Sequence, residues 1–177
     1  MSSTAKAYNK GVKNIDKAMK AIIKKAEKEN RCQFSGAFIA NDMQCVCDGY
    51  RAIRLHNAID LPRIQNDFDI TQIFSDLYVT AVQPLELPDL PNLKAYIKRG
   101  KAKNKANGLK ANTIILYDFG ENAPAVNAEY LADILTAFPA AIATWTNPIK
   151  PILFTDTAGD ALLLPVRKSQ TYTKGGQ

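Results

Sequence analysis

The chain has 177 residues, of which 46% are hydrophobic and 23% charged, and its formal net charge at pH 7 is +6. This length suits one well-packed domain, and the composition is that of a globular protein, which excludes a disordered or fibrous chain. The first residues lack the apolar core of a signal peptide, and no apolar run is long enough to span a bilayer. We therefore expect a cytoplasmic protein with no membrane contact.

Positive charge is concentrated in two segments of the chain. Residues 1–30 have a net charge of +5, and residues 94–110 have a net charge of +7 with no acidic residue. The intervening residues 56–93 have a net charge of −5. Such clustering favours contact with a polyanion over a role in general solubility.

Residues 14–30 have the pattern of an amphipathic helix, with Asn14 as its N-cap. The apolar positions recur at helical spacing and comprise Ile15, Ala18, Met19, Ile22, Ile23 and Ala26. The opposite face presents Lys13, Lys17, Lys20 and Lys24 at steps of four, three and four.

Two interpretations of this lysine face remain open. It is either an ordinary solvated surface or a contact for a phosphate backbone. Like charges at i,i+4 repel, and a passing phosphate backbone would relieve that repulsion while releasing counterions.

Three short strands are predicted after the helix, over residues 33–40, 43–47 and 50–55. Asn41-Asp42 and Asp48-Gly49 supply the turns between them. Cys45 and Cys47 lie two apart on the second strand, so they point to one side and are expected to pack as small hydrophobic residues. With His56 as the single histidine, we expect no metal site.

The middle of the chain, residues 56–110, has a less regular pattern. A helix over 69–77 and a strand over 78–82 are predicted before a segment broken by prolines. Residues 94–110 indicate a mobile loop or a ragged hairpin. This basic stretch, with Lys98, Arg99 and Lys101 at its centre, is a second candidate for nucleic-acid contact.

The last third repeats the order of the first. A strand is predicted over 113–119, then a helix over 128–138 capped by Asn127, then strands over 141–146, 151–155 and 161–166. The chain therefore predicts one α+β domain in which a helix plus three antiparallel strands is duplicated about a pseudo-two-fold axis, with the helices on one side of the sheets. We assign the halves to about 12–55 and 111–168, a variable insert to 56–110 and a disordered tail to 169–177.

Three segments resemble the bacterial sliding clamp, the beta subunit of DNA polymerase III. Residues 46–52 (VCDGYRA) are similar to the ATDGHRL segment of that family. Residues 126–135 (VNAEYLADIL) resemble the Asn-x-x-Tyr-Leu start of its last-domain helix, and residues 162–167 (LLLPVR) resemble its C-terminal Pro-x-Arg strand. The segments occur in the order that the family has.

The resemblance implies a short clamp with about one DNA-clamp-like domain. In the family, helices line a central hole and present basic residues to duplex DNA without reading its sequence, so Lys13, Lys17, Lys20 and Lys24 would contact the DNA. It also implies an oligomer and a cleft that binds peptides of polymerase or repair proteins. The residues that match this cleft are Cys47, Gly49, Tyr50, Arg51, Leu162, Leu164 and Pro165.

No catalytic residue or cofactor is expected, because the sequence has neither a phosphate-binding glycine loop nor a nucleophile beside His56. The alternative to DNA contact is a monomeric protein-binding or peptide-binding module on the same scaffold. It is favoured by the second predicted helix, which presents the acidic Glu129 and Asp133 and no lysine.

Overall fold

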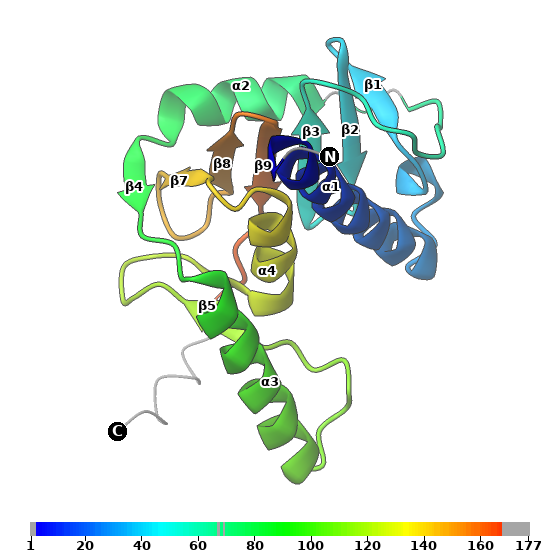
Figure 1. The fold of residues 1–177 in the computed structure, drawn as a ribbon. Helices are drawn as coiled ribbons and strands as arrows, with labels where there is room; N and C mark the ends of the chain where they lie inside the picture. Colours follow the sequence, from blue (N-terminus) through cyan, green and yellow to red (C-terminus); the bar gives the residue numbers. More distant parts are fainter. Residues whose placement is uncertain (1–2, 67, 69, 168–177) are drawn as a thin grey trace.

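The computed structural model describes residues 3–66, 68 and 70–167, so the predicted tail at 169–177 lies outside the described residues. Within them the chain forms an α+β fold with four α-helices, a seven-stranded antiparallel sheet and a two-stranded hairpin (Figure 1). The α+β class expected from the sequence is confirmed.

The helices are α1 (Ser3–Lys28), α2 (Ile70–Thr80), α3 (Leu90–Ala106) and α4 (Ala128–Ala137), with a 3-10 turn η1 (Cys32–Phe34). The large sheet contains β1 (Phe38–Ala40), β2 (Met43–Cys47), β3 (Arg51–Leu55), β4 (Gln83–Leu85), β7 (Ile142–Trp145), β8 (Ile152–Asp156) and β9 (Gly159–Leu163). The hairpin consists of β5 (Leu116–Asp118) and β6 (Ala125–Asn127).

The first helix and its strands follow the sequence pattern with two corrections. Helix α1 begins at Ser3, so Asn14 lies inside the helix and does not cap it. The strand predicted over 33–40 is shorter, because η1 occupies its start and β1 begins at Phe38. Asn41 and Asp42 form the tight β1–β2 turn with φ of 49° and 60°, a conformation that Asn and Asp tolerate.

The last third agrees closely with the prediction. The Asn127 side chain accepts a hydrogen bond from the Glu129 backbone N–H at 2.9 Å, which caps α4. Strands β7 and β8 fall within a residue of the predicted ranges, whereas β9 begins two residues earlier and ends three residues earlier than predicted.

The large sheet has the strand order β1-β2-β3-β9-β8-β7-β4, and every neighbouring pair is antiparallel. The two three-stranded meanders therefore meet at β3 and β9. The register places Val46, Ile53, Ala161, Phe154 and Ala143 in one row across five strands.

This row belongs to the main hydrophobic core, which α1 and α4 cover together. Both predicted helices thus lie on the same face of the sheet. The opposite face is also covered, because Ile70, Phe74 and Leu77 of α2 pack on a second core. Helices therefore lie on both sides of the sheet, and the expectation of helices on one side only is wrong.

The insert is more regular than the sequence pattern indicated. Helix α2 continues to Thr80, so the strand predicted over 78–82 is wrong, and β4 follows it at Gln83–Leu85. The basic segment predicted as a loop or hairpin is mostly the helix α3, with its Asp89 side chain accepting from the Asn92 N–H at 3.2 Å.

One face of helix α3 packs against the rest of the protein. Leu93 is buried, Ile97 packs against the main core, and the Tyr96 hydroxyl donates to the Leu116 carbonyl at 2.6 Å. Gly100 faces Ile115 so closely that a Cβ would lie 2.9 Å from its side chain. The rest of the helix extends away from the sheet (Figure 1).

Candidate nucleic-acid interface

The predicted lysine face exists as a surface of α1. Lys13, Lys17, Lys20 and Lys24 are all exposed. With 3.6 residues per turn they occupy a band of about 60° of the helix circumference, and the rise of 1.5 Å per residue spreads them over about 16 Å. The buried residues of α1 lie on the other side of the helix, against the sheet. These four residues are referred to below as the α1 stripe.

The α1 stripe is largely unneutralised. Lys20 pairs with Asp16 at 2.9 Å, an exposed i,i+4 pair. Among the side chains that the structure describes, Lys13, Lys17 and Lys24 have no carboxylate within ion-pair distance. Three ammonium groups are therefore available to an external anion.

Helix α4 packs beside α1, and its outward face has the acidic residues that the sequence indicated. Each of them is paired. Glu129 lies 2.5 Å from the Lys101 ammonium of α3, and Asp133 lies 2.6 Å from Nη1 of Arg51. The acids of α4 are thus neutralised by cations from other elements, which sequence proximity could not indicate.

Arg51 is held in a buried network at the β2–β3 turn. Its side chain is 3% exposed, and its Nε donates to Oδ2 of the fully buried Asp48 at 3.1 Å. Oδ1 of Asp48 accepts the backbone N–H groups of Tyr50 and Arg51 at 2.9 and 3.0 Å. The Arg51 guanidinium also lies 4.2 Å from the centre of the Tyr130 ring.

Arg31, just after the end of α1, binds the same β2–β3 turn. Its Nη1 donates to the Asp48 carbonyl at 2.8 Å, its Nη2 donates to the Tyr50 hydroxyl at 3.0 Å, and its guanidinium lies 4.5 Å from the Tyr50 ring centre. Gly49 has φ of 82°, and a Cβ there would lie 1.8 Å from Arg31. The role of Arg31 has no signal in the sequence, because nothing in its local pattern marks a residue that binds a carbonyl 17 positions further along the chain.

Lys25 and Glu29 form an ion pair near the end of α1, beside the Arg31 contacts. Their side chains lie 2.5 Å apart. The hydrogen bond to Glu29 raises the pKa of Lys25, and the same hydrogen bond lowers the pKa of Glu29. Both groups therefore remain charged over the whole neutral range.

The residues matched to a peptide cleft are divided between core and surface. Cys47 and Leu162 are buried in the core beneath α2, and Arg51 is held in the network described above. Tyr50 and Leu164 are 37% and 38% exposed, and the Leu164 N–H donates to the Tyr50 carbonyl at 2.8 Å. Gly49 and Pro165 are partly exposed beside them.

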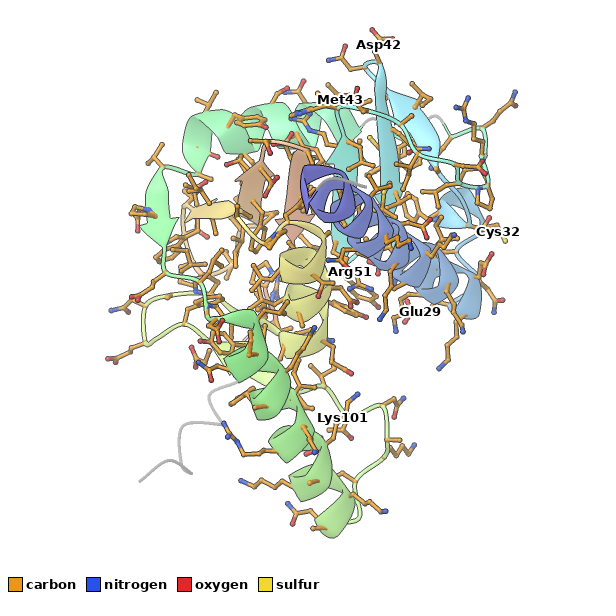
Figure 2. The ribbon with its side chains drawn as sticks, viewed as in Figure 1. Glu29, Cys32, Asp42, Met43, Arg51 and Lys101 are labelled. Carbon is orange, nitrogen blue, oxygen red and sulfur yellow. The ribbon has the colours of Figure 1, made fainter. Side chains whose placement is uncertain are left out.

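The basic candidates of the insert lie on α3. Lys98, Arg99 and Lys101 are all exposed, on a helix that contains no acidic residue. Lys101 lies on α3 (Figure 2) and pairs with Glu129 of α4. Helix α4 contacts both basic helices, α1 and α3.

Two other kinds of site were considered. In the part of the chain that the structure describes, no group of three or more His, Cys, Asp or Glu residues could hold a metal ion. Two surface hollows of about 480 and 410 Å³ lie near Trp145 and Pro139, and the second is lined in part by Asp89 and Leu90 at the start of α3.

Within the described residues, no helix combines the length and hydrophobicity needed to cross a bilayer. Comparisons with protein-family models, curated proteins and solved structures found no match to this chain.

Proposed function

We propose that this chain is a non-catalytic, sliding-clamp-like protein that contacts duplex DNA through the α1 stripe without reading its sequence. The observation that supports this most is the unneutralised row of Lys13, Lys17 and Lys24 on the outward face of a helix that is fixed to a sheet. A rigid row of cations matches the regular charge of a phosphate backbone better than it matches a folded protein surface.

The contact would be independent of sequence because of the residue type. Lysine offers a point charge on a flexible stem, which suits phosphate oxygens. Sequence readout uses side chains that reach base edges, with arginine, asparagine and glutamine forming the bidentate pairs. The α1 stripe contains lysine alone.

The arrangement of the sheet supports the clamp-like part of the proposal. The order β1-β2-β3-β9-β8-β7 has two helix-linked meanders meeting in an antiparallel β3–β9 pair. We propose that they are a duplicated unit related by a pseudo-two-fold axis between β3 and β9, as in one domain of the sliding clamp that the sequence resembles.

An encircling protein would need more than one copy of this chain. One copy supplies α1 and α4, whereas a ring would require several such pairs of helices around a duplex. Self-encirclement therefore requires a solution mass that is a multiple of 19.5 kDa. Light scattering over a wide concentration range measures this mass, and a strict monomer would restrict the proposal to binding on an open surface.

The decisive test replaces two members of the stripe. Lys17→Ala/Lys24→Ala is expected to weaken binding to duplexes of unrelated sequence by the same factor. The slope of log K against log salt should become shallower by about 1.8, because each lost phosphate contact removes about 0.9.

Arg63→Ala/Lys150→Ala provides the matched control, since both side chains are exposed and neither lies on α1, α3 or α4. Equal weakening by the two double variants would refute a specific role for α1, and unchanged binding by the stripe variant would refute the proposal.

A second candidate is recruitment of polymerase or repair proteins through a short peptide. The adjacent exposed side chains of Tyr50 and Leu164 favour it. It requires Tyr50→Ala to lose a protein partner while the stripe variant keeps it, and a partner retained by Tyr50→Ala would count against it.

A further inference from the structure

Helix α3 repeats the charge pattern of α1. Lys94, Lys98, Lys101 and Lys105 follow one another at steps of four, three and four, the same steps as in the α1 stripe. Because α3 is helical, these residues occupy a band of about 60° on one flank of it. All four are exposed, and they are referred to below as the α3 stripe.

The direction of the α3 stripe follows from one contact. Lys101 reaches Glu129, which lies on the side of α4 opposite its buried residues Leu131 and Leu135. The α3 stripe is therefore on the flank turned toward the outward face of α4. The lysines of α1 also point away from the sheet, so both stripes border the same outward surface.

Each acid on the surface between the stripes has a cation beside it. Glu129 and Asp133 would repel a phosphate backbone if they stood alone. Lys101 and Arg51 pair with them at 2.5 and 2.6 Å. Lys25 of α1 lies 5.9 Å from the Tyr50 ring centre, which is 6.0 Å from that of Tyr130 on α4, so contacts extend from α1 to α4 and, through Glu129, on to α3.

We infer that a duplex contacts both stripes and crosses α4 between them, with Lys101 acting through Glu129. This inference rests on the proposed function and extends it. Lys94, Lys98 and Lys105 provide phosphate contacts, whereas Lys101 is a positioning residue that neutralises the acid beside the duplex path. The ligand class is a double-stranded nucleic-acid backbone long enough to reach from α1 to α3.

The first experiment compares the two flanks of α3. Lys98→Ala/Lys105→Ala removes two members of the stripe, and Lys103→Ala/Lys110→Ala removes the same charge from the other flank and from the segment just after the helix. Binding to a short duplex is measured by fluorescence anisotropy at several salt concentrations, with circular dichroism to verify folding.

The stripe variant is expected to bind about tenfold more weakly at moderate salt, with a slope shallower by about 1.8, while the control keeps the wild-type slope. Equal effects from the two flanks, or no effect from either, would overturn the inference. If α1 variants weaken binding and α3 variants do not, the proposed function stands and this extension fails.

The second experiment separates Lys101 from the phosphate contacts. Lys101→Ala should weaken binding by exposing the Glu129 charge, and adding Glu129→Gln should restore it. Lys101→Ala/Glu121→Gln has the same net charge, but Glu121 lies in the exposed turn after β5, so it should not restore binding. If Glu129→Gln gives no rescue, Lys101 itself contacts phosphate and the positioning role is wrong.

Discussion

Arg51 and Asp133 join the two halves of the protein through an ion pair of 2.6 Å, although 82 residues separate them along the chain. Arg51 is the first residue of β3, next to the β2–β3 turn, and Asp133 belongs to α4. The segment that resembles a sliding clamp, residues 46–52, is thus held against the segment that resembles its last-domain helix, residues 126–135. The contact links the sheet to the helices that form the candidate interface.

Arg51→Ala should be strongly destabilising. It leaves the fully buried Asp48 carboxylate without its cation, and removing one partner of a buried pair costs about 3–5 kcal/mol of unfolding free energy. Asp133→Asn should cost about 1 kcal/mol or less, because Asp133 is 40% exposed and Asp48 keeps Arg51. Urea unfolding measures both, with the exposed Arg99→Ala as control. Equal losses for Arg51→Ala and Asp133→Asn would contradict this order.

The pair of Arg54 and Asp160 beneath α2 allows a different comparison. The two residues are cross-strand neighbours, their side chains lie 2.9 Å apart, and the Arg54 guanidinium lies 4.1 Å from the Phe74 ring centre. Arg54→Met alone should cost about 3–5 kcal/mol, because Asp160 is left charged in the core.

Arg54→Met/Asp160→Leu should recover most of that loss, since the buried charge is removed together with its partner. Guanidinium unfolding of the three proteins measures the coupling. A double variant that is less stable than the single one would contradict the explanation.

Two glycine-to-alanine changes should have opposite signs. At Gly159 a Cβ would lie 2.2 Å from the Arg54 carbonyl oxygen, so the β3 and β9 backbones would have to separate, at a cost of about 2–3 kcal/mol. At Gly11, inside α1, nothing lies within 4 Å, so alanine should stabilise the protein by about 0.5–1 kcal/mol. Thermal unfolding distinguishes them, and a stable Gly159→Ala protein would show that the sheet register is different.

The cysteines should differ in reactivity. Burial raises the pKa of Cys45 and Cys47 from 9.0 to about 11, whereas Cys32 is exposed. At pH 8 a thiol reagent should modify Cys32 in the native protein and all three cysteines in denaturant. Rapid modification of Cys45 or Cys47 without denaturant would contradict their burial.

The raised pKa values of Cys45 and Cys47 should make the protein less stable at alkaline pH. The folded state holds these two protons more tightly than the unfolded state. The stabilisation is therefore complete below pH 9.0 and is lost as the pH rises toward about 11. Unfolding curves between those values should show falling stability, and Cys45→Ala/Cys47→Ala should lose less over the same range.

The parts of the fold that the sequence predicts well are those with a strong local signal. Helix α4 has a capping residue in Asn127 and a stop at Pro139, so both of its ends were predicted within about a residue. Strands β2 and β3 flank an Asp-Gly turn and were found in the same way.

Helix α3 was mistaken for a loop because its stability comes from elsewhere in the chain. Its glycine and asparagines have low helix propensity and its lysines repel one another at i,i+4, whereas Leu93 and Ile97 dock the helix on the main core. The spacing of Leu93, Ile97 and Gly100, after Asp89 and Pro91, was the available signal. Without it, the α3 stripe could not be recognised.

The parts of the candidate site that depend on local spacing were predictable, and the parts that depend on tertiary packing were not. Helical spacing alone places Lys13, Lys17, Lys20 and Lys24 on one face. The sequence predicts only an acidic surface on α4. The cations that pair with it come from distant elements, Lys101 for Glu129 and Arg51 for Asp133.

The most direct measurement is the salt dependence of wild-type binding to two duplexes of unrelated sequence. Each phosphate contact contributes about −0.9 to the slope of log K against log salt. Three unneutralised lysines in the α1 stripe therefore imply a slope of about −2.7 or steeper. We expect this slope, with similar affinities for both duplexes. No binding at low salt, or strong preference for one sequence, would contradict the claim that this surface holds duplex DNA by its backbone.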